Sequence, residues 1–216
     1  MRCDEKLRFT APADNSRPYG SHRFDTFCIK VGRRATVFGD LCLSALIRLE
    51  IDPSVLAYCE RPMVLEDLKP RRVVDFWVKR TSGEELWFLL RPSEKVWPTG
   101  TGGPGKAFST WASAQNMTVV LCPRGDIALS DVARRNWTHI LCYLNANRTY
   151  VDTRLTEMVH LLCRNEISIK EIQNQLQEKD PVLVRTALFL LMYEGRVVSP
   201  QIESVPIGAE TVVIRK

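Results

Sequence analysis

Two apolar stretches joined by a short turn constrain the fold of this chain most strongly. The first stretch covers residues 71–78 and the second covers residues 85–92, with Thr81-Ser82-Gly83 between them. Both stretches are rich in valine, leucine and aromatic residues, which favour strands, and a small polar turn with glycine reverses the chain. The sequence therefore predicts a central β-hairpin, around which the other elements have to pack.

The polar residues of this hairpin define what chemistry it can carry. A metal-dependent nuclease hairpin of this shape needs an acid on the first strand. It also needs an acid or amide two residues before a lysine on the second strand, so that both side chains share one face. The first strand has Asp75, but Leu89 and Arg91 occupy the corresponding positions of the second strand. The pattern indicates a nuclease-derived protein that no longer cuts.

Length and composition allow one large domain or two smaller ones. The chain has 216 residues, 45% of them hydrophobic, and a formal charge of +5. Its longest apolar run, residues 186–193, is far shorter than the roughly 20 residues that span a bilayer. The first 23 residues are polar and charged, unlike a signal peptide, and the seven cysteines are odd in number and scattered. We expect a cytoplasmic protein with reduced thiols, no membrane contact and no cofactor.

The segments around the hairpin predict an α/β domain over residues 23–150. A strand is expected at residues 23–30, and a helix is expected from Asp40 to a point before Pro53. Further segments predict short strands and two more helices, and the whole pattern is typical of a mixed sheet that is flanked by helices. These further segments are the strands 55–59, 63–65 and 117–122, the helix 108–115 and a helical stretch through Trp137 to Leu144.

Residues 151–216 predict a second domain, a winged helix. Helices are expected from Thr153, from Ser168, where Glu171 completes a capping box, and from Pro181. Strands follow at residues 196–199 and 210–214. The third helix is mostly apolar, which favours protein docking or a scaffolding role over base-specific DNA reading.

Basic residues gather in the first part of the chain, and residues 1–22 predict an extended basic segment. One interpretation is a solvated surface that keeps the protein in solution, and the other is a phosphate-binding surface. The candidate DNA-binding residues are Arg23, Lys30, Arg33, Arg34, Arg71 and Arg72.

The order of these segments resembles the TnsA family, the endonuclease subunit of heteromeric cut-and-paste transposases. The likeness begins at Lys30-Val31-Gly32-Arg33 and continues through Leu49–Val55. It includes Glu60-Arg61-Pro62 and Val74-Asp75-Phe76, and then the segment from Trp111 to Val120. This resemblance implies a restriction-endonuclease-like fold followed by a winged helix.

Carried onto this chain, the family's active site is degenerate. Cys42 stands where the resemblance places the first acid, and Asp75 matches the central acid. Leu89 replaces the second-strand ligand and Arg91 replaces the lysine. No catalytic residue set is expected intact, because magnesium prefers oxygen ligands and Asp75 alone could hold it only weakly. We interpret Asp75 as a residual polar group, with Arg91 as its expected ion-pair partner.

The resemblance implies an inactive structural or regulatory subunit of a DNA transposition complex. Its expected partners are a DDE-type transposase, an AAA+ ATPase regulator of the TnsC type and transposon-end DNA. Two alternatives stay open, a magnesium-dependent endonuclease with relocated ligands and a stand-alone DNA-binding regulator. The candidate relocated acids are Asp40, Glu60, Glu84, Glu85 and Glu94.

A phosphate-loop spacing, Gly100 to Lys106, offers a rival interpretation of the region after the hairpin. Ala107 follows it instead of a magnesium-binding Ser or Thr, and the preceding segment is a poor buried strand. We therefore expect a loop there and no nucleotide site.

Overall fold

The computed structural model describes residues 7–65, 72–90 and 104–216. The chain divides into two compact units, one made of residues 1–49 and 54–128, the other of residues 50–53 and 129–216. Arg71, Arg91 and residues 100–103 of the phosphate-loop spacing lie outside the described residues.

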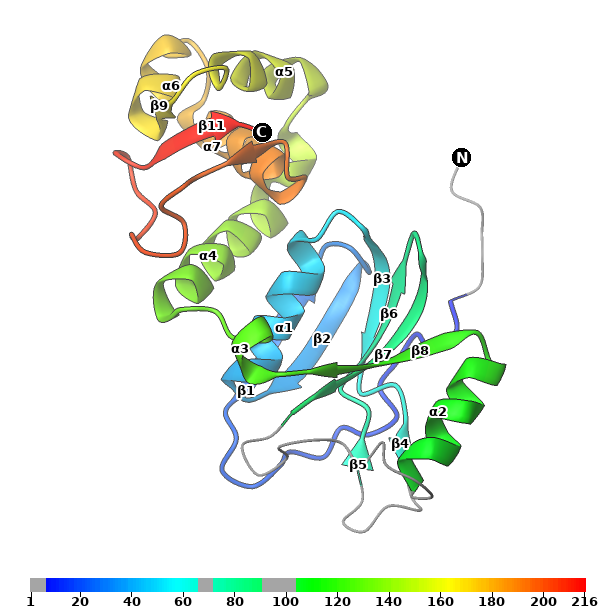
Figure 1. The fold of residues 1–216 in the computed structure, drawn as a ribbon. Coiled ribbons are helices and arrows are strands. Elements are labelled where there is room, and N and C mark those ends of the chain that lie inside the picture. The colour runs from blue at the N-terminus through cyan, green and yellow to red at the C-terminus, as the bar shows by residue number, and fades with distance from the viewer. Residues whose placement is uncertain (1–6, 66–71, 91–103) are drawn as a thin grey trace. The chain divides into compact units, whose positions relative to one another are not determined.

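The first unit is built on a four-stranded mixed sheet with the order β3-β6-β7-β8 (Figure 1). These strands are β3 (Val55–Glu60), β6 (Phe76–Arg80), β7 (Gly83–Leu89) and β8 (Met117–Cys122). The first three run antiparallel and β8 pairs parallel to β7. The predicted central hairpin is confirmed as β6 and β7, and Gly83 supplies the positive φ of 144° that the tight reversal requires.

Two helices cover opposite faces of this sheet. Neighbouring residues on a strand point to opposite faces. Trp77 packs in one core cluster with Ala112 of α2 (Pro104–Ala114), whereas Phe76 lines a pocket with Cys42 of α1 (Asp40–Ile51). A mixed sheet flanked by helices, as the sequence predicts, is therefore present.

The core on the α2 face is aromatic and closely packed. Trp77, Leu86 and Phe88 have no exposed surface, and Phe88 meets Phe108 edge to face with ring centroids 5.7 Å apart. Trp77 also donates from Nε1 to Glu84 at 2.9 Å, which satisfies its polar atom. This core fixes the hairpin from which the candidate site extends.

A second hairpin precedes α1 and was only half predicted. It pairs β1 (Arg23–Cys28) with β2 (Arg33–Phe38) in antiparallel register. The sequence analysis predicts one strand at residues 23–30 and then the helix from Asp40, and so β2 was missed. Its two leading arginines hide the alternation, because only Ala35 and Val37 are buried. The remaining short elements of this unit are β4 (Val64–Leu65), β5 (Arg72–Val73) and α3 (Arg124–Ile127).

The second unit contains four α-helices and a small three-stranded sheet with the order β10-β11-β9. The three helices predicted from Thr153, Ser168 and Pro181 are present as α5, α6 and α7, and β10 and β11 match the predicted strands. The bounds are α4 (Asp131–Asn147), the 3-10 helix η1 (Arg148–Tyr150), α5 (Thr153–Leu162), β9 (Ile167–Ser168), α6 (Ile169–Gln175), α7 (Pro181–Tyr193), β10 (Val197–Val198) and β11 (Val212–Arg215).

The division between the units lies earlier than residue 150, where the sequence analysis places it. The helix α4 belongs to the second unit because Tyr143 meets Phe189 of α7 edge to face, with ring centroids 5.4 Å apart. His139 contacts the same ring at 6.1 Å. Among the described residues no helix is long and apolar enough to cross a membrane.

Substitution of Ser168 tests the capping box that starts α6. The Ser168 hydroxyl accepts from the backbone N–H of Glu171 at 3.2 Å, and the Glu171 carboxylate accepts from the Ser168 N–H at 2.8 Å. We expect Ser168→Ala to lower the free energy of unfolding by about 1 kcal/mol, because one terminal N–H loses its acceptor. Urea unfolding measures this change, and the exposed Ser204→Ala serves as control. Equal stability of both variants would contradict the capping role.

Candidate functional site

The carboxylate of Asp75 lies directly before β6 and is held from several directions. Its backbone N–H donates to Trp87 O at 3.0 Å, and its carbonyl accepts from the Arg61 N–H at 2.9 Å. Its side-chain Oδ2 accepts from the Leu89 N–H at 2.8 Å and lies 3.2 Å from Nη2 of Arg72. The hairpin strands and the end of β3 therefore fix this carboxylate in place.

The guanidinium of Arg72 neutralises this carboxylate from inside the protein. Arg72 is 5% exposed, and its Nη2 also donates to Leu89 O at 2.9 Å. Its central carbon lies 5.7 Å from the centroid of the Phe88 ring. A divalent cation at Asp75 would face this fixed positive charge, so the arrangement favours a structural ion pair over a metal site.

Cys42 and Asp75 line one pocket of about 80 Å³. Burial raises the pKa of the Cys42 thiol to about 12, and the nearby Asp75 carboxylate adds to the shift. The same two causes raise the pKa of Cys122 to about 12. Both thiols are therefore neutral near pH 7 in the metal-free protein, and neither supplies the oxygen ligand that magnesium prefers. The other lining residues are Pro18, Val37, Phe38, Glu60, Arg61, Arg72, Val73 and Phe76.

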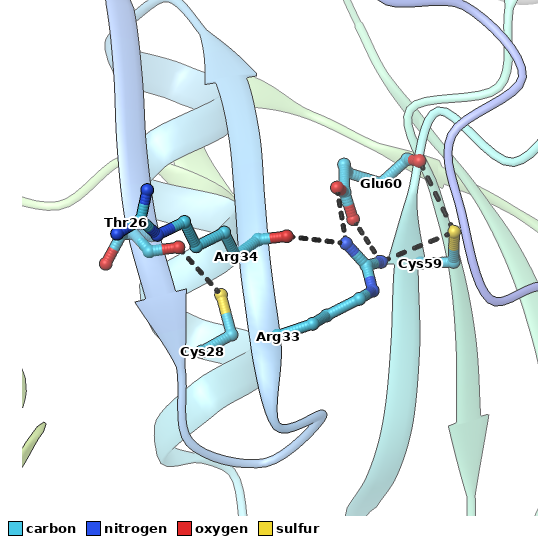
Figure 2. A network of polar contacts seen from close by, with 6 residues as sticks. All are labelled: Thr26, Cys28, Arg33, Arg34, Cys59 and Glu60. Carbon is cyan, nitrogen blue, oxygen red and sulfur yellow. Dashed lines mark hydrogen bonds and ion pairs between the residues drawn. The ribbon is translucent and has the colours of Figure 1, made fainter.

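Glu60, a second acid that lines this pocket, is also paired with an arginine (Figure 2). Arg33 of β2 donates to Oε1 at 2.7 Å and to Oε2 at 2.5 Å, and the Glu60 side chain is only 2% exposed. The hydrogen bonds that Arg33 donates to Glu60 raise the pKa of Arg33 above its ordinary value. Arg33 also reaches Cys59 Sγ at 3.6 Å. The bidentate pair joins the β1–β2 hairpin to the edge of the sheet.

Arg61 attaches the beginning of the chain to the rim of the pocket. Its guanidinium donates to Ser16 O and to Asp14 Oδ2, both at 2.6 Å, and its carbonyl accepts from the Ala13 N–H at 2.8 Å. Its φ is 47°, a left-handed conformation that costs roughly 1 kcal/mol for a residue with a side chain. Sequence reasoning missed this contact, and its one local signal is Asp14, whose side chain accepts from the Ser16 N–H at 2.7 Å.

The structure brings together three of the four predicted site positions. Cys42 and Asp75 share the pocket, and Leu89 contacts Asp75 through its backbone while its side chain is buried. The expected ion pair of Asp75 with Arg91 involves a residue outside the described ranges. Within those ranges the Asp75 partner is Arg72, which the sequence analysis had assigned to DNA.

The predicted DNA-binding residues occupy different environments. Lys30 donates from Nζ to Leu49 O at 2.8 Å, near the end of α1. Arg23 pairs with Asp25 on the exposed hairpin at 2.9 Å, and Arg34 is exposed. Arg33 and Arg72 make the internal pairs described above, so within the described ranges Arg23 and Arg34 are the candidates that point to solvent.

The other acids proposed as relocated ligands lie in separate pairs. Glu84 accepts from Arg8 at 2.7 Å, and Glu85 accepts from Arg80 at 3.0 Å. Asp40 stands in the first turn of α1, and Glu94 lies outside the described residues. In the part of the chain that the structure describes, no group of at least three His, Cys, Asp or Glu side chains could hold a metal ion.

Comparison with known proteins adds no family assignment, since no family model and no curated protein matches the chain.

Removal of the Asp75 carboxylate tests whether it is a structural ion-pair partner. Asp75→Ala leaves the buried Arg72 guanidinium without this counter-ion, so we expect a loss of roughly 3 kcal/mol in the free energy of unfolding. Urea unfolding is the measurement. Asp25→Ala, which removes a solvent-exposed partner of Arg23, should change stability little. A stabilised Asp75→Ala variant would instead indicate a carboxylate held under repulsion, as in a cation site without its cation.

The reactivity of Cys42 tests its raised pKa. With a pKa of about 12, roughly one Cys42 thiol in ten thousand is ionised at pH 8, and only the thiolate is nucleophilic. Iodoacetamide should therefore modify the exposed Cys142 of the folded protein long before Cys42, as followed by peptide mass spectrometry. Unfolding in urea should remove the difference. Equally fast labelling of Cys42 in the folded protein would contradict a neutral, shielded thiol.

Proposed function

We propose that this chain is a catalytically inactive TnsA-like subunit of a heteromeric DNA transposition complex. It acts as a scaffold between a DDE-type transposase, an AAA+ regulator of the TnsC type and transposon-end DNA. The proposal assigns a restriction-endonuclease-like fold to the first unit and a winged helix to the second.

The arrangement of both units supports this assignment of folds. In the first unit, α1 precedes a mixed sheet in which the β6–β7 hairpin is followed by α2 and a parallel strand, β8. In the second, α5, α6 and α7 are followed by the β10–β11 ribbon, and β9 completes the sheet. Three helices followed by a ribbon are the elements of a winged helix.

The neutralised Asp75 is the observation that carries the proposal. An active site of this type collects carboxylate and other oxygen ligands around an ion. Here the first ligand position is the neutral thiol of Cys42, the second is the aliphatic Leu89, and Arg72 holds Asp75 at 3.2 Å. Such a pocket stabilises the subunit and cannot readily activate a water molecule for attack on DNA.

The apolar third helix of the second unit favours a docking role over base reading. Seven of the thirteen residues of α7 are buried, and Arg185 is its single charged residue. A groove-reading helix presents several polar or basic side chains on one face. We therefore assign to this unit contact with the regulator or the transposase.

A cleavage assay tests the inactive-subunit proposal. The protein is incubated with supercoiled plasmid, or with transposon-end DNA and transposase. It should cut no strand in magnesium or manganese, because arginine side chains already neutralise the carboxylates of the pocket. Wild type and Asp75→Ala should give identical gel patterns. The complex itself is tested by co-elution of the protein with a transposase and an AAA+ regulator encoded beside it, and failure to bind either would contradict the scaffold role.

An active endonuclease is the second candidate, and the position of Glu60 favours it. Glu60 and Asp75 line the same pocket, and one or two carboxylates can suffice for a magnesium ion. In this case 5′ ends would be cut with manganese, and both Asp75→Ala and Glu60→Gln would abolish the cleavage. Arg33→Gln, which frees Glu60 from its pair, would then tighten metal binding as measured by calorimetry.

A further inference from the structure

The outer edge of β8 pairs with no strand in the described part of the chain. This strand ends the sheet order β3-β6-β7-β8. The Cys122 carbonyl accepts from the Leu90 N–H at 3.0 Å, so the backbone groups of Cys122 point toward β7. By the alternation of a strand, those of Val119 and Leu121 point outward. Within the described ranges no backbone group bonds to them, and both residues are only partly buried.

Among the described residues, β3 and the β1–β2 hairpin carry protection against edge pairing that β8 does not show. The edge strand β3 has a register shift between Val55 and Ala57, and its end at Glu60 is held by Arg33 of the neighbouring hairpin. The β1–β2 hairpin carries several charged residues of its own. Bulges, charges and covering elements are the means by which proteins keep edges from pairing. In contrast, β8 reads Met-Thr-Val-Val-Leu-Cys, without a charge, a proline or a shift in register.

We propose that β8 pairs antiparallel with β8 of a second copy of this chain, so that the two sheets join across a two-fold axis at Val119. In this register Val119 lies opposite Val119 of the second copy, and Met117 lies opposite Leu121. The backbone groups of these residues all point outward, so each opposed pair can exchange both of its hydrogen bonds.

The side chains of this register are self-complementary. Met117 opposite Leu121 and Val119 opposite its twin are apolar pairs. On the other face Thr118 lies opposite Val120, a pair of β-branched residues of the kind that stabilises antiparallel sheets. No charged side chain meets another, because the strand has none. An isologous interface requires a symmetric register in which every opposed side-chain pair fits. Because β8 meets this requirement with itself, we choose a second copy of the chain as its partner.

The expected dimer is weak. One pair of short strands buries less surface than the 1,200 Å² or so of a typical specific interface, so dissociation at low concentration follows. The exposed Trp111 of α2, stacked on Phe108 with ring centroids 5.4 Å apart, can add apolar contact on the α2 face. Phe108 packs against the same core cluster as Val119 and Leu121.

Sedimentation velocity over a wide concentration range tests the proposal on the full chain. We expect a monomer–dimer equilibrium that Thr118→Lys weakens about tenfold or more, because two lysines would lie diagonally across the axis. Thr118 is exposed, so the variant should keep the unfolding midpoint of the wild type. The matched control is Ser113→Lys, an equal charge change on the exposed surface of α2, which should leave association unchanged.

Amide hydrogen exchange locates the interface independently. The Val119 and Leu121 amides should become more protected as concentration rises, and this effect should disappear in Thr118→Lys. A monomer at every concentration would overturn the proposal. This holds whether the β8 edge then stays unpaired or pairs with a strand of another protein. So would a dimer that is insensitive to Thr118→Lys, or one whose protected amides lie elsewhere.

Discussion

The contacts of Arg72 with Asp75 and Leu89 determine the charge balance of the pocket in the first unit. A buried guanidinium is stable only where acceptors surround it, and here one nitrogen serves both the carboxylate and the backbone carbonyl. Because Leu89 also donates its N–H to Asp75, the start of β6 and the end of β7 are tied together by polar groups as well as by the ladder. The pocket beside them therefore has its charges balanced from within.

The same solution recurs at the neighbouring edge of the sheet. Glu60 is nearly inaccessible and is held by Arg33, while Arg61 is held by Asp14. Both acids that line the pocket, Glu60 and Asp75, have an arginine in contact. A catalytic centre needs an excess of negative charge to attract a cation, whereas these pairs supply cohesion between segments that are distant in sequence.

The sequence predicts most of the fold because long periodic segments dominate it. The hairpin 76–89, the helix before Pro53 and the three helices of the second unit all carry strong local signals. The strand β2 lacks one, since Arg33 and Arg34 begin it, and the assignment of α4 to the second unit depends on the contact between Tyr143 and Phe189. In the site, the family resemblance placed Cys42 with Asp75 and Leu89, but it could not identify Arg72 as the partner of Asp75. That choice depends on the course of the chain through residues 72–75, which has no motif.

The left-handed Arg61 connects the order of synthesis to the assembly of the pocket. Residues 13–16 are synthesised before their partner Arg61, which follows β3, and β3 is aligned only when β6 pairs with it. Contacts between residues this distant in sequence form late in folding. Closing the loop between them costs entropy, which is offset only once the sheet has formed. The rim of the pocket is consequently among the last parts to mature. A fusion placed directly before residue 13 would therefore perturb the sheet edge at Arg61, which is distant from it in the sequence.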